Sequence, residues 1–84
     1  MADAKSLKSK IIAAANAKIR IWSDSPDRQY RKAARELLHA KHTMELLYET
    51  DKRTFSLVYG ELGGMTDTAV VRELLNMERR QAQA

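Results

Sequence analysis

Basic side chains at helical spacing are the most prominent chemical feature of this sequence. Between residues 28 and 42 they recur every three or four positions, at Arg28, Arg31, Lys32, Arg35, His39 and His42. At about 100° per residue of an α-helix they share one narrow face, with Arg31 at its margin. Arginine and lysine donors at this density suit phosphate oxygens or surface carboxylates. The pattern predicts a surface that binds nucleic acid or an acidic protein through Arg28, Arg31, Lys32, Arg35 and His39; a solvated helix face is the third interpretation.

The position of these cations on the helix favours a ligand. Three of them fall in the first two turns of a helix expected to begin at Pro26, where the helix dipole disfavours positive charge by about 0.3 kcal/mol or more each. Asp24 and Asp27 offset part of that cost. Positive charge at the start of a helix slightly lowers folding stability. This cost favours the interpretation that these residues bind a ligand.

Metal binding and catalysis find little support in the residues. His39 and His42 are three positions apart and could share an ion, but zinc needs a third and usually a fourth ligand. The chain has no Cys and no Gly-rich phosphate loop, and Ser, His and acidic residues are not arranged as a recognisable triad. We therefore expect no enzymatic activity, no metal, no cofactor and no small-molecule substrate.

Residues 62–75 share some features with a DNA-binding helix-turn-helix. They combine glycines, an early Thr/Asp cap and a second apolar helix, which are the right parts. With Gly63 as the turn glycine, however, Tyr59 falls where a small residue is expected and Arg72 where an apolar one is expected. The acidic Asp67 and Glu73 would also face the groove. An ordinary hairpin within a helical bundle is the favoured interpretation.

Apolar periodicity predicts the elements that position these groups. We expect helices over residues 3–22, 26–49, 51–62 and 67–80, with a polar tail over 78–84 that frays. Ser25 should cap the second helix, with Pro26 at its first position. Gly63 and Gly64 should end the third, because glycine accepts the left-handed conformation at a helix C-terminus. Residues 54–59 also have strand-like composition, and a lone strand would have to pair between two chains.

A heptad-like apolar seam runs along the second predicted helix. Its members are spaced 3, 4, 3, 4 and 3 apart, at Tyr30, Ala33, Leu37, Ala40, Met44 and Leu47. Such a seam packs either inside the monomer or against a second copy, and the spacing does not choose between them. Because so short a chain has a modest core, we expect a homodimer.

Composition bounds the protein class. The 84 residues carry a net charge of +4, from +6 in residues 1–42 and −2 in residues 43–84. The absence of Cys excludes disulfides, and no apolar run approaches the roughly 20 residues that span a bilayer. With 3 Gly and 1 Pro, the chain favours helix throughout. These features predict one all-α domain over residues 1–84, a small three- or four-helix bundle in the cytoplasm with no membrane partner.

The leading functional hypothesis is a small, non-enzymatic regulatory protein that acts in nucleic-acid transactions, such as transcription, through the basic face of its second helix. DNA and RNA are not distinguished. The alternative is a protein-binding modulator, such as an inhibitor or antirepressor, that docks on a larger protein. A small size and a seam open to a partner suit this alternative almost as well.

Overall fold

Four α-helices and one 3-10 helix account for nearly the whole of the described chain. The computed structural model describes residues 3–83, in which the elements are α1 (Ala4–Ser23), α2 (Arg28–Thr50), α3 (Lys52–Tyr59), the 3-10 helix η1 (Gly60–Gly64) and α4 (Asp67–Gln83). No strand occurs among these residues. The all-α prediction is therefore confirmed, and residues 54–59 are helical.

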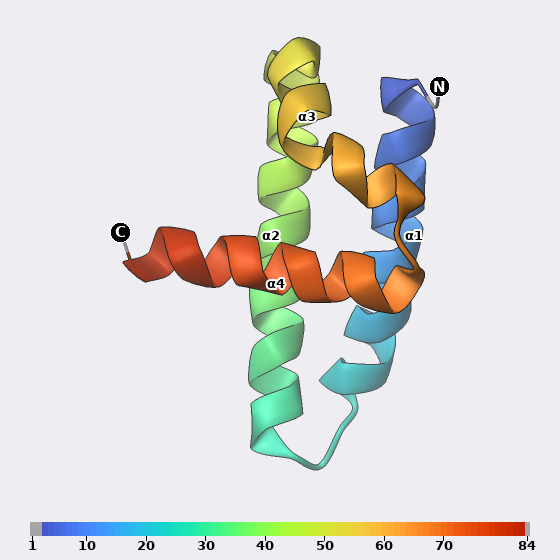
Figure 1. Cartoon of the computed structure of the whole chain (residues 1–84). Coiled ribbons are helices and arrows are strands. Elements are labelled where there is room, and N and C mark those ends of the chain that lie inside the picture. Colours follow the sequence, from blue (N-terminus) through green and yellow to red (C-terminus); the bar gives the residue numbers. More distant parts are fainter. Residues whose placement is uncertain (1–2, 84) are drawn as a thin grey trace.

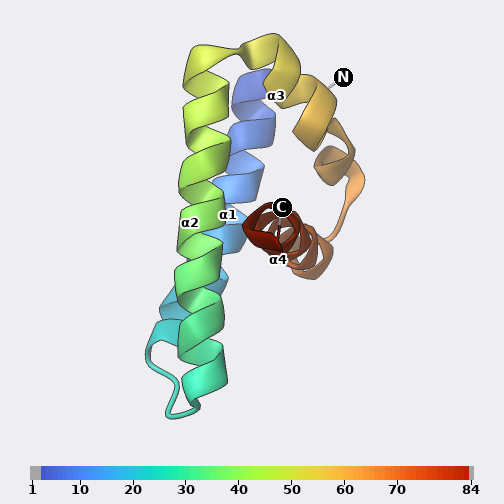
Figure 2. The same cartoon turned by 90° about the vertical axis from the view of Figure 1, so that its left-hand side faces the viewer.

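Two long helices form the frame that the other elements cover. α1 and α2 pack as an antiparallel hairpin, α3 and η1 turn back across one end of it, and α4 crosses both long helices (Figure 1). Seen along α4, the part of the hairpin nearest the α1–α2 loop extends past α4 with no third element over it (Figure 2). This uncovered end includes the first turns of α2, where the basic face begins.

Side-chain caps fix where the helices begin. Asp3, Asp27 and Asp51 each accept a hydrogen bond from a backbone N–H two or three residues later, and Thr66 does so for α4. The second helix begins at Arg28 rather than Pro26. Ser25 Oγ accepts a bond from Asp27 N–H at 3.1 Å in a turn that precedes the helix, which leaves Asp27 as the cap.

The core lies where the inward faces of all the helices meet. Its fully buried large side chains are Ile11, Leu37, Met44, Phe55, Val70 and Leu74. The Phe55 ring lies between Tyr48 and Tyr59, with ring centroids 5.3 Å from each. This aromatic cluster holds α3 against α2 and explains why residues 54–59 are helical: one face of the helix buries Phe55 and Tyr59, which are four residues apart.

Two details of the C-terminal half differ from expectation. The helical segment that begins with α3 does end at Gly64, as predicted, but neither Gly63 nor Gly64 has a positive φ. Instead, Lys10 Nζ donates to the carbonyl oxygens of Gly63 and Met65, at 2.7 and 2.8 Å, and satisfies the end of η1. The last helix also continues to Gln83 instead of fraying from residue 78, because side chains in its last turns contact α2, as described below.

Candidate functional site

Three of the predicted basic residues form an exposed row on α2. Arg28, Lys32 and Arg35 are all exposed, and within the described chain none of them forms an ion pair or a side-chain hydrogen bond. They lie on the half of α2 that is nearest the uncovered end of the hairpin (Figure 2). We call these three residues the basic row. Its donors are free to meet a polyanion without breaking an internal contact.

The other two predicted basic residues have partners inside the chain. Arg31 is half-buried, and its Nη1 donates to the Ser25 carbonyl oxygen at 2.8 Å, which closes the loop between α1 and α2. His39 Nδ1 contacts the Glu78 carboxylate of α4. The imidazole stays 68% exposed while the carboxylate is only 14% exposed. These two contacts make Arg31 and His39 part of the scaffold that orients the basic row.

The histidine pair does not converge with further metal ligands. His42 is exposed one turn beyond His39, and across residues 3–83 no three His, Cys, Asp or Glu side chains cluster in a way that holds an ion. The nearest carboxylate to this pair is Glu78, which already contacts His39.

The predicted seam divides into buried and exposed parts. Leu37, Ala40 and Met44 are buried in the chain's own core, and Leu47 and Ala33 are half-buried. Tyr30 is 50% exposed and packs on Trp22, with 6.0 Å between ring centroids. The middle of the seam is therefore covered by α1, α3 and α4 of the same chain and is not free for a second copy.

Grooves lie on both flanks of α4. One groove, of about 500 Å³, is bounded by Lys32 and Glu36 of α2 and by Arg79 near the end of α4. Arg79 Nε and Nη2 each donate to a different oxygen of Glu36 at 3.3 Å. A second groove, of about 240 Å³, is lined on the same flank by Lys18, Trp22, Thr68, Val71, Arg72 and Leu75.

Sequence reasoning missed the second groove. No sequence pattern relates Lys18 of the first predicted helix to Arg72 of the last. The crossing of α4 over α1 places both in the lining of one groove, together with the half-buried Trp22. The only signal available in the sequence was Trp22 itself, an aromatic side chain beside the break at Ser23–Pro26.

Another groove, of about 320 Å³ on the opposite flank of α4, is apolar. It is lined by Leu46, Leu47, Val58, Tyr59 and Met77, with Thr43, Thr50 and Gln81 at its edges. Leu46 is 65% exposed and Val58 45%, although both line this groove. We call Leu46 and Val58 the apolar patch. Exposed apolar groups this close together mark an interaction surface more often than isolated ones do.

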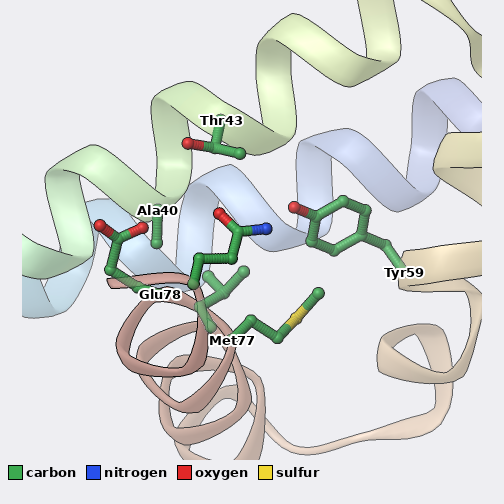
Figure 3. Close-up of a pocket in the computed structure, with 7 residues that line it drawn as sticks. Ala40, Thr43, Tyr59, Met77 and Glu78 are labelled. Carbon is green, nitrogen blue, oxygen red and sulfur yellow. The ribbon is translucent and has the colours of Figure 1, made fainter. Parts of the chain in front are cut away.

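The pocket between α2, α3 and α4 is too small for a substrate. Its volume of about 10 Å³ is close to that of one water molecule. Ala40, Thr43, Tyr59, Met77 and Glu78 surround it (Figure 3). Burial, and secondarily the Glu78 charge, raises the pKa of the Tyr59 hydroxyl above its ordinary value of 10.0. This perturbed phenol is thus a feature of packing at the junction of three helices.

Residues 62–75 fold as part of the bundle. α4 buries Val70, Val71, Leu74 and Leu75 across α1 and α2, so most of its inward side is engaged in the core. Arg72 stands at the edge of that contact and is exposed.

No protein-family model matches the chain, and neither a curated protein nor a solved structure shows significant similarity to it. Within residues 3–83, no helix is both long and apolar enough to cross a membrane.

Proposed function

We propose that this protein is a non-enzymatic regulatory binding protein that acts in nucleic-acid transactions, with the basic row as its phosphate-binding surface. The observation that carries the proposal is the row itself: Arg28, Lys32 and Arg35 are exposed, adjacent on one face, and without an internal partner in the described chain. Phosphate contacts supply most of the affinity of non-specific nucleic-acid binding. A cytoplasmic location belongs to the same proposal.

The local electrostatics support a polyanionic ligand. The basic row begins at the N-terminus of α2, where both the helix dipole and the side chains attract negative charge. Two of the nearby acids have partners: Asp27 caps α2 and Glu36 pairs with Arg79, whereas Asp24 is an exposed charge beside the α1–α2 loop. The cations Arg28, Arg31, Lys32 and Arg35 outnumber Asp24 and Asp27 at this end.

Salt-dependent binding tests the proposal. Labelled oligonucleotides titrated at about 50 mM salt, where phosphate contacts are strongest, should bind the wild-type protein. Each of Arg28→Ala, Lys32→Ala and Arg35→Ala should weaken binding for every sequence and reduce the salt slope by about one unit. Arg53→Ala is the matched control, because Arg53 is exposed on α3 at the far end of the hairpin. No affinity for any nucleic acid under these conditions would refute the proposal.

We further propose that the protein is a homodimer that forms through the apolar patch. The chain's own helices cover Leu37, Ala40 and Met44, so the middle of the seam is not open to a second copy. The patch and the groove beside it remain open, and a second copy would remove Leu46 and Val58 from water.

The same apolar patch favours the second candidate function, a protein-binding modulator such as an inhibitor or antirepressor. An amphipathic helix of a larger protein could lie in the groove between α2, α3 and α4 with its apolar side chains on Leu46 and Val58. Substitutions in the patch would then abolish capture of a polypeptide partner that survives nuclease treatment, while substitutions in the basic row would leave that capture unchanged.

A further inference from the structure

The two grooves that contain cations both lie along α4. Arg79 and Gln83 line the groove of about 500 Å³, and Thr68, Arg72 and Leu75 line the groove of about 240 Å³ that contains Trp22. Their spacing of three or four residues places them on one side of the helix. From Thr68 to Gln83 this side is about 22 Å long at 1.5 Å per residue. We call it the α4 ledge, formed by these residues together with Lys18, Trp22 and Lys32.

Positive charge is distributed along the whole α4 ledge. Lys18 and Arg72 flank one end and form no ion pair within residues 3–83, and Lys32 of the basic row stands at the other end. The one carboxylate among the lining residues, Glu36, is paired with Arg79. The ledge therefore carries a net excess of cations, arranged on both of its walls.

The groove at the α1 end also has an aromatic and aliphatic lining. Trp22 is half-buried, and its groove is completed by Val71 and Leu75, whose side chains are mostly buried. A ligand that suits this end must offer a flat or apolar group together with negative charge for Lys18 and Arg72.

We propose that the α4 ledge binds a single strand of nucleic acid, with a base against Trp22 and the flanking phosphates on Lys18 and Arg72. This inference rests on the proposed function and specifies its ligand. A base in a duplex has both faces stacked on its neighbours, so it cannot reach an aromatic ring inside a groove, whereas an unpaired base can. A charged groove with an aromatic stacking surface is the usual combination in proteins that bind single strands.

Intrinsic fluorescence tests the proposal directly, because Trp22 is the only tryptophan in the chain. A thymidine oligonucleotide of about ten nucleotides, within the usual site sizes, is titrated beside a duplex of the same length. The single strand should change the Trp22 emission and bind at least about fivefold more tightly than the duplex, as expected for one stacked base.

Three variants locate the contacts. Arg72→Ala and Lys18→Ala should each weaken single-strand binding several-fold and reduce the salt slope by about 0.7. Arg53→Ala should leave both quantities unchanged. Trp22→Leu, measured with a labelled oligonucleotide, should weaken binding by about fivefold or more. Since Trp22 also packs beside the core, a circular dichroism spectrum of this variant must match the wild type; if it does not, the Arg72 and Lys18 variants decide the question.

The outcomes separate the inference from the function on which it rests. Equal affinity for the two nucleic acids, lost on Lys32→Ala but not on Arg72→Ala, would overturn the inference and leave the basic row as the site. Absence of binding to both would overturn the inference and the proposed function together. A Trp22 response to an acidic amphipathic peptide, with none to the single strand, would assign the ledge to a protein ligand and also overturn the inference.

Discussion

Arg79 and Glu36 form the two-bonded contact that fixes the last turns of α4 to α2, with both N–O distances at 3.3 Å. Their side chains are 51% and 26% exposed, so the pair contributes only about 0.5 kcal/mol to folding. Its larger consequence is electrostatic. The charges of Arg79 and Glu36 offset each other, and the other charged residues that line the α4 ledge are all positive.

Glu36→Gln should therefore strengthen nucleic-acid binding. The substitution removes the one carboxylate in the groove and leaves Arg79 free for a phosphate, which should increase affinity several-fold and steepen the salt slope by about one unit. The free energy of unfolding should fall by no more than about 1 kcal/mol, as measured by urea titration. Glu45→Gln, which alters an acid of α2 outside the groove, is the control. Weaker binding by Glu36→Gln would contradict a role for this groove.

Tyr59 makes the protein sensitive to alkali. Burial raises the pKa of its hydroxyl above 10.0, so the unfolded chain loses this proton at a lower pH than the folded chain does. The corresponding stability is fully present below about pH 10 and is lost as the pH rises toward the folded pKa. Tyr59→Phe should remove part of the alkaline loss seen in urea unfolding between about pH 9 and pH 11.

The matched control for this prediction is Tyr30→Phe, because the Tyr30 ring is 50% exposed. This variant should retain the wild-type alkaline slope. An unchanged slope in Tyr59→Phe would show that the Tyr59 hydroxyl is as well solvated in the folded state as in the unfolded chain.

The cap of α3 makes the protein sensitive to acid. A hydrogen bond from the Thr54 hydroxyl, and then one from the Thr54 N–H, holds the pKa of Asp51 below its ordinary value of 3.8. The resulting stability is present above about pH 4 and is lost as the pH falls through the lowered pKa of Asp51. Thr54→Ala should lower the urea midpoint at neutral pH, and its difference from wild type should shrink below about pH 3.

Ser56→Ala controls for helix propensity in this experiment, since Ser56 is exposed on α3 with no side-chain hydrogen bond in the described chain. Its midpoint should track the wild type across the acid range. A pH-independent difference between Thr54→Ala and wild type would mean that the hydroxyl does not act through the Asp51 carboxylate.

The fold class and the helix positions could be predicted because their causes are local. The intervals of three and four residues that separate Leu37, Ala40 and Met44 mark the inward side of α2 and identify it as a helix. The start of α2 was misplaced because both Ser25 and Asp27 have capping side chains. Which of the two residues caps the helix is decided by the turn in which the Asp27 N–H donates to Ser25 Oγ.

The candidate site could be predicted only in part, for the opposite reason. The basic row shares one helix, so its periodicity reveals it. The groove between Lys18 and Arg72 depends on how α4 crosses α1, and no local pattern reports that crossing. The pairing of His39 with Glu78 and of Glu36 with Arg79 is equally non-local, because the partners are separated by 39 and 43 positions in the sequence. These contacts are also why the polar end of α4 is helical.

Self-association through the apolar patch gives the last prediction. Light scattering at a protein concentration of about 100 μM should give twice the 9.6 kDa mass of one chain. This concentration is above any dissociation constant that would make the dimer functionally relevant. Leu46→Asp and Val58→Asp should each produce a monomer, because a dimer would bury the new carboxylate without a partner. Both side chains are exposed in the single chain, so the helix content of the monomer should not change. Ile21→Asp, at another exposed apolar position, should remain a dimer. A wild-type mass of one chain would refute dimerisation and leave the apolar patch to a different protein.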